Sequence, residues 1–363
     1  MPITNDRRPA ATLVFALMLV CAGCGETAPE GSAGAPGPSA AGGSGSSSPR
    51  TGPRLMFITN GTSDWWNAVE KGMNDGAAEF GAQVEMRRNK DGDPNGQIKL
   101  LEDVLSLPDI QGVAVSVMEK DSPGIADKMR ELQKAGKVVL AIDSDGQKDA
   151  RRAYIGTNNR SAGEVAGQVA KTLRPQGGKT VAFVGTAAAA NAIERREGFF
   201  AGAGASFPQA EIFEDGTDSS RAQINVQTAI SKYPDIGVFL GLWSYNAHLI
   251  AQEVNKFPEL RQKVTIVTFD LDELAVQDVA GGGIDATVCQ NPYEMGYRAV
   301  RLLKAVIEKD QKTIDAMLPG GTDTIDTGVR VVVPKKDSPV KGSNVIDIEE
   351  MKSWLASKGL KST

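Results

Sequence analysis

The feature of the sequence that most constrains the fold is an alternation, from Arg54 onward, of short β-rich runs with amphipathic stretches of helical length. "RLMFITN" is followed by "WWNAVEKGMNDGAAEFG", "AQVEMRR" by "GQIKLLEDVLSL", and "IQGVAVSV" by "PGIADKMRELQKAG". Such alternation is typical of parallel strands joined by crossover helices. A second series follows "AYIGTNN". We therefore expect an α/β protein with two doubly wound parallel-sheet lobes.

The residues before this pattern have a different composition. "NDRRPA" is basic, "ATLVFALMLV" is apolar and "CAGC" is small, which is the order of an export signal and is too short for a comfortable membrane span. We expect residues 1–23 to be a signal peptide and residues 24–53, which are rich in Gly, Ser, Ala and Pro, to be a flexible tether. A plain secretory signal, in which Cys21 and Cys24 have no special role, is the alternative to the lipid-anchored signal described below.

Charge and reactive side chains argue against several function classes. The 40 Lys and Arg and 45 Asp and Glu give a net charge of −5 and form no basic block of the kind that binds nucleic acid. The chain has three cysteines, too few for a disulfide framework once the signal is removed, and Cys289 is expected to be an inert buried thiol. The only histidine, His248, has no metal-binding or triad partners in the sequence and is expected on a helix surface.

Side chains suited to a neutral polyol follow the ends of several expected strands. The segments are "TSDWW", "AIDSDG", "LWSYN", "TFDLDE" and "CQNPYE". In doubly wound sheets, ligands lie beyond the carboxyl ends of the strands. Carboxylates and carboxamides pair with hydroxyl groups, and an aromatic plane covers the C–H face of a sugar ring. Adjacent helical residues point about 100° apart, so Trp65 and Trp66 cannot share one narrow core stripe.

These segments, in this order, resemble the periplasmic sugar-binding proteins of the ribose-binding type that serve ABC importers. The resemblance runs from about Arg54 to Pro334 and rests on "SDWWNAVEKGMNDGAAEFG", "VVLAIDSD", "IERREGF", "VTFDLDE" and "ATVCQNPYEMG". It implies that the sugar is bound by Trp65, Trp66, Asp143, Arg195, Asp270 and Gln290. Separately, "LVCAGCG" resembles a bacterial lipobox, which makes Cys24 the acylated residue, although Cys21 stands where Leu is usual.

The chain departs from the ribose-binding pattern in three places. Ser144 and Asp145 follow the first ligand Asp where ribose binders carry Arg, Asp218 lies near the position of a missing stacking Phe, and the loop after "IGVFLGLW" looks longer. We expect Trp243 in that loop to supply the missing stacking surface. The departures leave the ligand open among pentoses, hexoses and related polyols. The full predicted sugar-binding set is Ser63, Trp65, Trp66, Asp143, Ser144, Asp145, Arg195, Asp218, Trp243, Asn246, Asp270 and Gln290.

The resemblance also implies a type I periplasmic binding protein fold, in which a three-strand hinge joins two lobes that close around one sugar. Residues 54–157 with 291–326 would form the N-terminal lobe, and residues 158–290 with 327–336 the C-terminal lobe. Residues 337–363 are expected to be an extension that contains one amphipathic helix. A membrane permease would then recognise the closed form.

We therefore expect an exported, lipid-anchored monomer that delivers a monosaccharide or related polyol to an ABC permease and uses no cofactor or metal. Two other roles stay open. The chain is alternatively a sensor that presents its ligand to a chemoreceptor or a membrane kinase. Less favoured is a hydrolase that uses a pair of aspartates on glycosides or nucleosides.

Overall fold

The computed structural model describes residues 52–363. The predicted signal peptide, Cys24 and the predicted tether up to residue 51 lie outside these residues. Within the described part of the chain, no helix is both long enough and apolar enough to cross a membrane.

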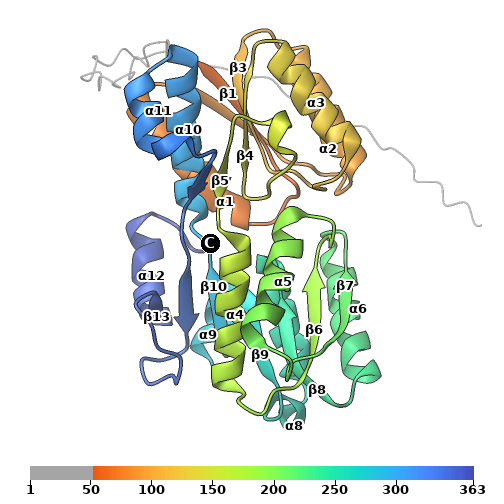
Figure 1. The fold of residues 1–363 in the computed structure, drawn as a ribbon. Helices are drawn as coiled ribbons and strands as arrows, with labels where there is room; N and C mark the ends of the chain where they lie inside the picture. Colours follow the sequence, from red (N-terminus) through yellow and green to blue (C-terminus); the bar gives the residue numbers. More distant parts are fainter. Residues whose placement is uncertain (1–51) are drawn as a thin grey trace, which may run out of the picture. The chain divides into compact units, whose positions relative to one another are not determined.

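The first sheet has the strand order β11-β5-β4-β3-β1-β2, and its strands all pair in parallel (Figure 1). We call this sheet and the helices that pack on it the first lobe. Its elements before the chain first leaves it are β1 (Arg54–Ile58), α1 (Trp65–Phe80), β2 (Gln83–Arg87), α2 (Pro94–Leu105), β3 (Ile110–Val115), α3 (Pro123–Lys134), β4 (Val138–Ile142), the 3-10 turn η1 (Lys148–Ala150) and β5 (Ala153–Gly156).

The second sheet has the strand order β13-β12-β10-β9-β8-β6-β7, and with its helices we call it the second lobe. Its elements up to β10 are α4 (Asn159–Leu173), β6 (Lys179–Val184), α5 (Ala190–Ala203), β7 (Gln209–Glu214), α6 (Ser219–Lys232), β8 (Ile236–Gly241), α7 (Ser244–Val254), α8 (Pro258–Arg261), β9 (Thr265–Phe269), α9 (Glu273–Ala280) and β10 (Ala286–Cys289).

The remaining elements return to the first lobe and then complete the second. They are α10 (Pro292–Glu308), α11 (Gln311–Met317), the 3-10 turn η2 (Pro319–Gly321), β11 (Thr324–Asp326), β12 (Arg330–Val333), β13 (Val345–Asp347) and α12 (Ile348–Ser357). Within residues 52–363 the chain thus crosses between the sheets after β5, after β10 and after β11. The predicted architecture of two doubly wound lobes is confirmed. It differs from the expected purely parallel pattern at one edge, because β12 pairs with β10 in the antiparallel direction and β13 pairs in parallel with β12.

Residues 337–363 are part of the second lobe rather than a separate extension. The sequence predicted only a helix here, but the structure adds the edge strand β13 before α12. Ile348, Met351 and Leu355 of α12 are buried in the same apolar core as residues of α7 and α9. A strand of three residues is too short for its side-chain alternation to be visible in the sequence.

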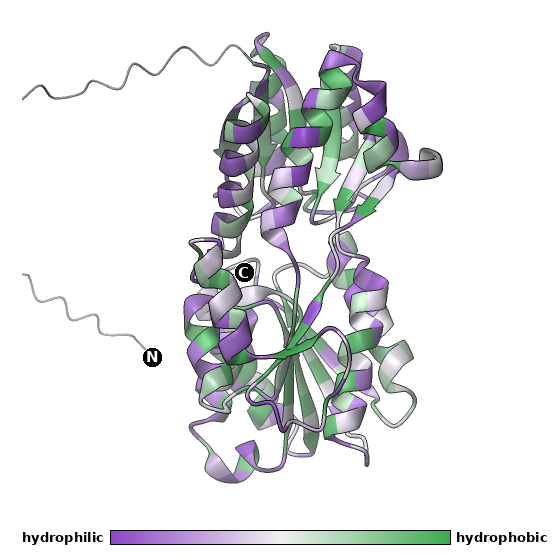
Figure 2. Cartoon of the chain, turned by 90° about the vertical axis from the view of Figure 1, so that its left-hand side faces the viewer, coloured by the Kyte–Doolittle hydropathy of each residue, from purple (hydrophilic) through white to green (hydrophobic). Residues whose placement is uncertain are grey.

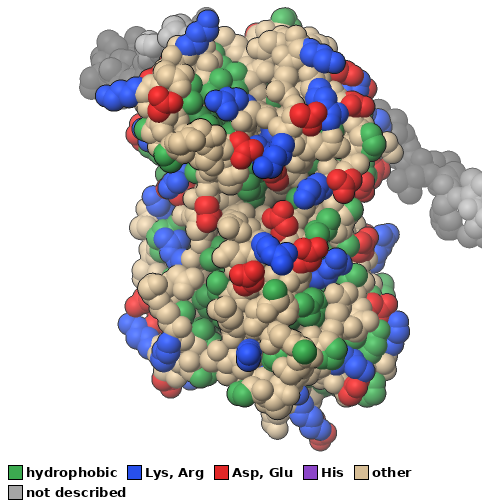
Figure 3. Space-filling model, viewed as in Figure 1, with side chains coloured by type: hydrophobic (Ala, Val, Ile, Leu, Met, Phe, Trp, Pro, Cys, Tyr) green, Lys and Arg blue, Asp and Glu red, His purple; other side chains and the backbone are tan. Residues whose placement is uncertain are grey.

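The central strands are buried on both faces, as expected where helices cover a parallel sheet. All residues of β8 and β9 are buried. Figure 2 shows hydrophobic strands inside helices that turn hydrophilic residues outward. On the face seen in Figure 3, basic and acidic side chains are intermixed. This core is what holds the strand ends, and the side chains that follow them, in fixed positions.

Candidate functional site

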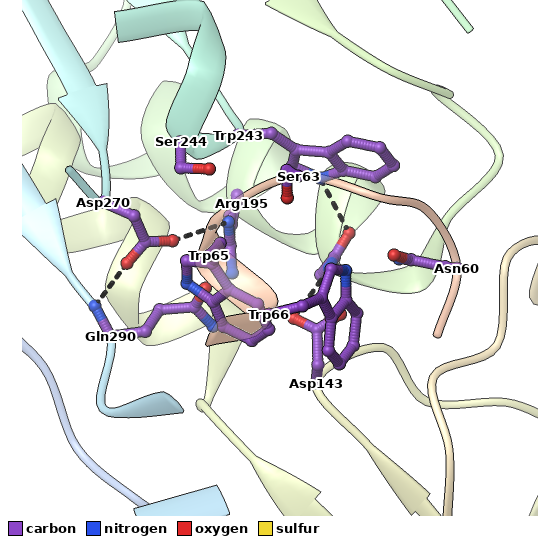
Figure 4. Close-up of a pocket in the computed structure, with 11 residues that line it drawn as sticks. Asn60, Ser63, Trp65, Trp66, Asp143, Arg195, Trp243, Ser244, Asp270 and Gln290 are labelled. Atoms are coloured by element: carbon purple, nitrogen blue, oxygen red, sulfur yellow. Dashed lines mark hydrogen bonds and ion pairs between the residues drawn. The ribbon is translucent and has the colours of Figure 1, made fainter. Parts of the chain in front are cut away.

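A pocket lies between the strand ends of the two lobes (Figure 4). It encloses about 310 Å³ of space between protein atoms, part of it open to solvent. Aromatic rings and hydrogen-bonding side chains from both lobes converge in it, as they do in sites for small ligands. Its lining residues are Asn60, Ser63, Trp65, Trp66, Asp143, Asn191, Arg195, Trp243, Ser244, Asp270 and Gln290.

Two aspartates occupy matching positions in the two lobes. Asp143 directly follows β4 and Asp270 directly follows β9, and each has a φ of 59°. The backbone N–H of Asp143 donates to Ile155 O on β5, and that of Asp270 donates to Val288 O on β10. A left-handed backbone is uncommon for a residue other than glycine and persists only where the surrounding structure fixes it. Here the hydrogen bond to the neighbouring strand fixes each aspartate.

The carboxylate of Asp143 is buried and accepts hydrogen bonds from both lobes. Ser116 Oγ donates to Oδ2 at 2.8 Å from the end of β3, and Asn191 Nδ2 donates to Oδ1 at 3.4 Å from α5. Burial raises the pKa of Asp143, while Arg195 and these hydrogen bonds act in the opposite direction. The side chain is therefore a preorganised acceptor at the boundary between the lobes.

The carboxylate of Asp270 has a different set of partners. Gln290 N donates to Oδ1 at 2.7 Å, and Arg195 Nη1 lies 4.0 Å from Oδ2. Burial raises the pKa of Asp270 to about 7, although Arg195 and the Gln290 N–H favour the charged form. Nearby Asp143 adds to the rise, so the two acids influence each other's charge.

Arg195 is held rigidly between these acids. Its Nε donates to Asn159 Oδ1 at 3.0 Å and its Nη1 to Leu242 O at 2.8 Å, and the guanidinium lies 4.6 Å from the centre of the Phe269 ring. Close packing of α4 against α5 places it, because a Cβ at Gly163 would lie 2.2 Å from Arg195 O. Its buried Nη2 has no hydrogen-bond partner within residues 52–363.

The adjacent tryptophans Trp65 and Trp66 begin α1, and both are buried. Their ring centres are 4.9 Å apart and the planes meet at 86°, an edge-to-face pair. The indole N–H of Trp65 helps to lower the pKa of Asp270, but it makes no hydrogen bond of normal geometry to any described residue. The two rings thus form one wall of the pocket in the first lobe, and the indole N–H of Trp65 is free to donate to a ligand.

Trp243 contributes a third indole ring to the pocket, from the second lobe (Figure 4). Its Nε1 donates to Asn191 Oδ1 at 3.2 Å. Gly185 provides the space beneath this ring, since a Cβ there would lie 2.2 Å from Trp243 Cζ3. Asn191 therefore bridges Trp243 of the second lobe and Asp143 of the first.

Gln290 lies where the chain returns from the second lobe to the first. Besides its N–H bond to Asp270, its Nε2 donates to Thr157 Oγ1 at 3.0 Å. Thr157 follows β5, at the other crossing. The side chain thus ties two crossing segments together at the base of the pocket.

The structure brings together most of the residues predicted from the sequence. Those that line the pocket are Ser63, Trp65, Trp66, Asp143, Arg195, Trp243, Asp270 and Gln290.

Four predicted residues do not line the pocket, for identifiable reasons. Asp145 forms a paired ion contact with buried Arg151, with oxygen-to-nitrogen distances of 2.6 and 2.7 Å. Asp218 is exposed and caps α6 by accepting from Arg221 N. Asn246 accepts from Trp243 N and donates to Asp215. Ser144 is buried, and its Oγ has no partner in the described part of the chain.

Sequence reasoning missed Asn60 and Asn191, and it noted Ser244 only as a loop residue. Asn191 precedes Arg195 by four residues and carries no motif of its own. Near the end of β7, where the comparison with the family pattern indicated Asp218, the buried acid is Asp215, and it accepts from the side chains of Tyr245 and Asn246. Burial raises its pKa to about 6.

The sequence predictions for Cys289 and His248 agree with the structure. Cys289 is a buried free thiol whose pKa burial raises well above the usual value. His248 is partly exposed on α7, and its Nδ1 lies 2.7 Å from Asp278. No group of three or more His, Cys, Asp or Glu side chains placed to hold a metal occurs among residues 52–363.

Comparison with known proteins gives concordant matches. A model of the periplasmic binding protein domain matches residues 55–311. The ribose import binding protein RbsB of Bacillus subtilis (strain 168) is 22% identical over 254 residues, which cover 69% of this chain and 81% of that protein.

Solved structures agree. An ABC transporter solute-binding protein from Burkholderia graminis C4D1M, in complex with D-arabinose, has a TM-score of 0.71 at 25% identity and covers 80% of this chain and 97% of that one. GanP, a glucose-galactose binding protein from Geobacillus stearothermophilus, has a TM-score of 0.71 at 24% identity over 80% and 99% of the two chains, which shows the shared fold.

Proposed function

Because the chain belongs to the periplasmic binding protein family, whose domain covers residues 55–311, we propose that it binds one monosaccharide or related polyol between its two lobes. The binding of ribose, D-arabinose, glucose and galactose implied by the names of its relatives supports a sugar as the ligand.

The observation that carries the proposal is a set of unused hydrogen-bonding groups in one buried pocket. Trp65 Nε1 and Arg195 Nη2 are donors without a partner in the described residues, and they lie beside the acceptors Asp143 and Asp270. A buried donor left unpaired costs about 1–3 kcal/mol. A hydroxyl group both accepts and donates, so a polyol satisfies both kinds of group at once.

The aromatic walls support the same ligand class. Trp65 and Trp66 come from the first lobe and Trp243 from the second. Rings of this kind cover the apolar C–H faces of a sugar, while the carboxylates reach its edge. In this assignment the Trp243 ring replaces the stacking Phe of the ribose-binding pattern, which is absent near Asp218.

Contacts from both lobes support closure around the ligand. Asn191 of the second lobe donates to Asp143 of the first, which brings the lobes together across the pocket. A ligand that touches both lobes stabilises the closed form by its preference for that form. The hinge consists of the three crossing segments, near residues 157–158, 291–292 and 326–327.

We further propose that the protein is exported, anchored through acylated Cys24 as a monomer, and delivers its sugar to an ABC permease without chemically changing it. Family membership and the sugar-transport relatives support delivery. The basic, apolar and small segments of the leader support export and anchoring.

A thermal-shift screen tests the proposal. The mature protein is heated with D-ribose, D-arabinose, D-glucose, D-galactose, D-xylose and D-tagatose in turn. A ligand at 100 times its dissociation constant adds about 2.7 kcal/mol to the free energy of unfolding, which gives a clear rise in melting temperature. Chromatography of the same samples after incubation should return the sugar unchanged. Stabilisation by none of these sugars, or conversion of one of them to another compound, contradicts the proposal.

A further inference from the structure

The loop that carries Asp270 is bonded to a segment far away in the sequence. Leu271, the next residue, donates its backbone N–H to Thr363 Oγ1 at 2.9 Å, and Thr363 N donates back to Leu271 O at 2.9 Å. Both residues are fully buried. The two backbone groups of Leu271 are therefore both satisfied by one residue that is 92 positions away in the chain.

The matching loop in the first lobe is held by its own neighbours instead. Ser144, which follows Asp143, donates its N–H to Ile142 O at 2.6 Å and accepts from Val117 N at 3.0 Å. Both backbone groups of Ser144 are therefore satisfied near the ends of β3 and β4. Leu271 depends on Thr363 for the equivalent bonds.

The hydrogen bond between Leu271 N and Thr363 Oγ1 affects the direction in which the Asp270 side chain points. Asp270 has a left-handed backbone with a φ of 59°, a conformation that costs about 1–3 kcal/mol and persists only where neighbours fix it. The peptide between Asp270 and Leu271 sets the remaining backbone angle. One side of that peptide is fixed by Thr287 Oγ1, which donates to Asp270 O, and the other by Thr363.

The segment that delivers Thr363 is firmly anchored. β13 pairs with β12 in the second sheet. Ile348, Met351 and Leu355 of α12 share one buried apolar cluster with Leu271 itself. Residues 345–363 thus pack against the back of the loop whose front faces the pocket.

We infer that residues 345–363 brace the binding loop of the second lobe and that Thr363 is a positioning residue for ligand binding through Asp270. This inference rests on the proposed function, since the ligand is the one that Asp270 would bind. Thr363 itself does not line the pocket.

The test compares three variants of the full-length protein. Thr363→Val keeps the shape of the side chain but removes the acceptor for Leu271 N–H, and Thr363→Ser keeps that acceptor. Lys361→Ala changes an exposed neighbour that forms an ion pair with Glu273. The sugar dissociation constant is measured by calorimetry between pH 6 and 8, and exchange of the Leu271 amide is measured in the ligand-free protein.

We expect Thr363→Val to weaken binding about tenfold, to shift the pH midpoint of affinity and to speed Leu271 exchange. Thr363→Ser and Lys361→Ala should stay within about twofold of the parent. An unchanged dissociation constant and pH midpoint in Thr363→Val overturn the inference, even if the melting temperature falls. If the parent protein binds no sugar, the proposed function fails, and Leu271 exchange alone decides whether the brace exists.

Discussion

The two lobes present the same acid at the same place and support it differently. Asp143 and Asp270 both follow a central strand, with the same φ of 59° and the same backbone bond to the next strand. Asp143 is surrounded by the neutral donors Ser116 and Asn191, whereas Asp270 lies beside the guanidinium of Arg195. The repeated strand-and-helix architecture therefore sets where the acids lie, and the side chains around each acid set how far its pKa departs from the ordinary value.

The largest effect should come from the cation that both acids share. Arg195 lowers the pKa of Asp143 and of Asp270, so Arg195→Met removes the positive charge that acts on both carboxylates. Breaking a buried ion pair by removing one partner costs about 3–5 kcal/mol. We expect a loss of about 3 kcal/mol in the free energy of unfolding, measured with denaturant, together with loss of sugar binding.

Arg196→Met is the matched control, because Arg196 is the partly exposed neighbour on the same helix. It should cost less than about 0.5 kcal/mol, as most surface substitutions do. Equal losses in the two variants would mean that Arg195 is not the cation that holds the acids.

The next effect separates the two acids by their pH dependence. Burial raises the pKa of Asp270 to about 7, so a fall from pH 8 to pH 6 protonates it and weakens the hydrogen bonds that it accepts. Sugar affinity should fall over this range in the parent protein. Asp270→Asn should weaken binding about tenfold at pH 8 and remove most of this pH dependence, as measured by calorimetry.

Asp143→Asn is the comparison variant, and it should weaken binding and keep a transition, which moves below that of the parent because the charge of Asp143 adds to the rise in the pKa of Asp270. The stability of the ligand-free protein should change with pH in the opposite direction to sugar affinity. Because the folded pKa of Asp270 lies above the ordinary value of 3.8, the free energy of unfolding falls as pH rises from about 4 to about 7. Asp270→Asn should flatten that fall. A pH profile of affinity that is unchanged in Asp270→Asn contradicts the assignment of Asp270.

A smaller effect is expected at the aromatic wall of the second lobe. An aromatic contact contributes about 0.5–1.5 kcal/mol beyond its buried area, so Trp243→Ala should weaken sugar binding roughly threefold to tenfold. Trp243→Phe keeps the ring plane but removes the N–H that bonds Asn191, and it should recover part of that loss. Equal affinity of parent and Trp243→Ala, by fluorescence or calorimetric titration, would exclude Trp243 as a sugar contact.

Sequence reasoning reached the fold and most of the site for physical reasons. The alternation of strands and helices is local, the strand-end rule marks the segments that contain Asp143, Asp270 and Gln290, and the resemblance to the family selects these residues within them. Sequence reasoning failed where contacts between residues far apart in the chain determine the role of a side chain. Asp145 looks like a site residue in the sequence, yet it pairs with Arg151, and nothing local shows that Thr363 reaches Leu271.

The smallest effect concerns Ser144, which takes in the first lobe the place that Leu271 takes in the second. Its Oγ is buried without a partner in the described residues, and the side chain does not line the pocket. Removing an unpaired buried hydroxyl relieves a desolvation cost, so Ser144→Ala should leave the free energy of unfolding unchanged or raise it by up to about 1 kcal/mol. Sugar affinity should stay within twofold of the parent. A clear loss of affinity in Ser144→Ala would mean instead that this hydroxyl bonds the ligand, and that the sequence assigned it to the site correctly.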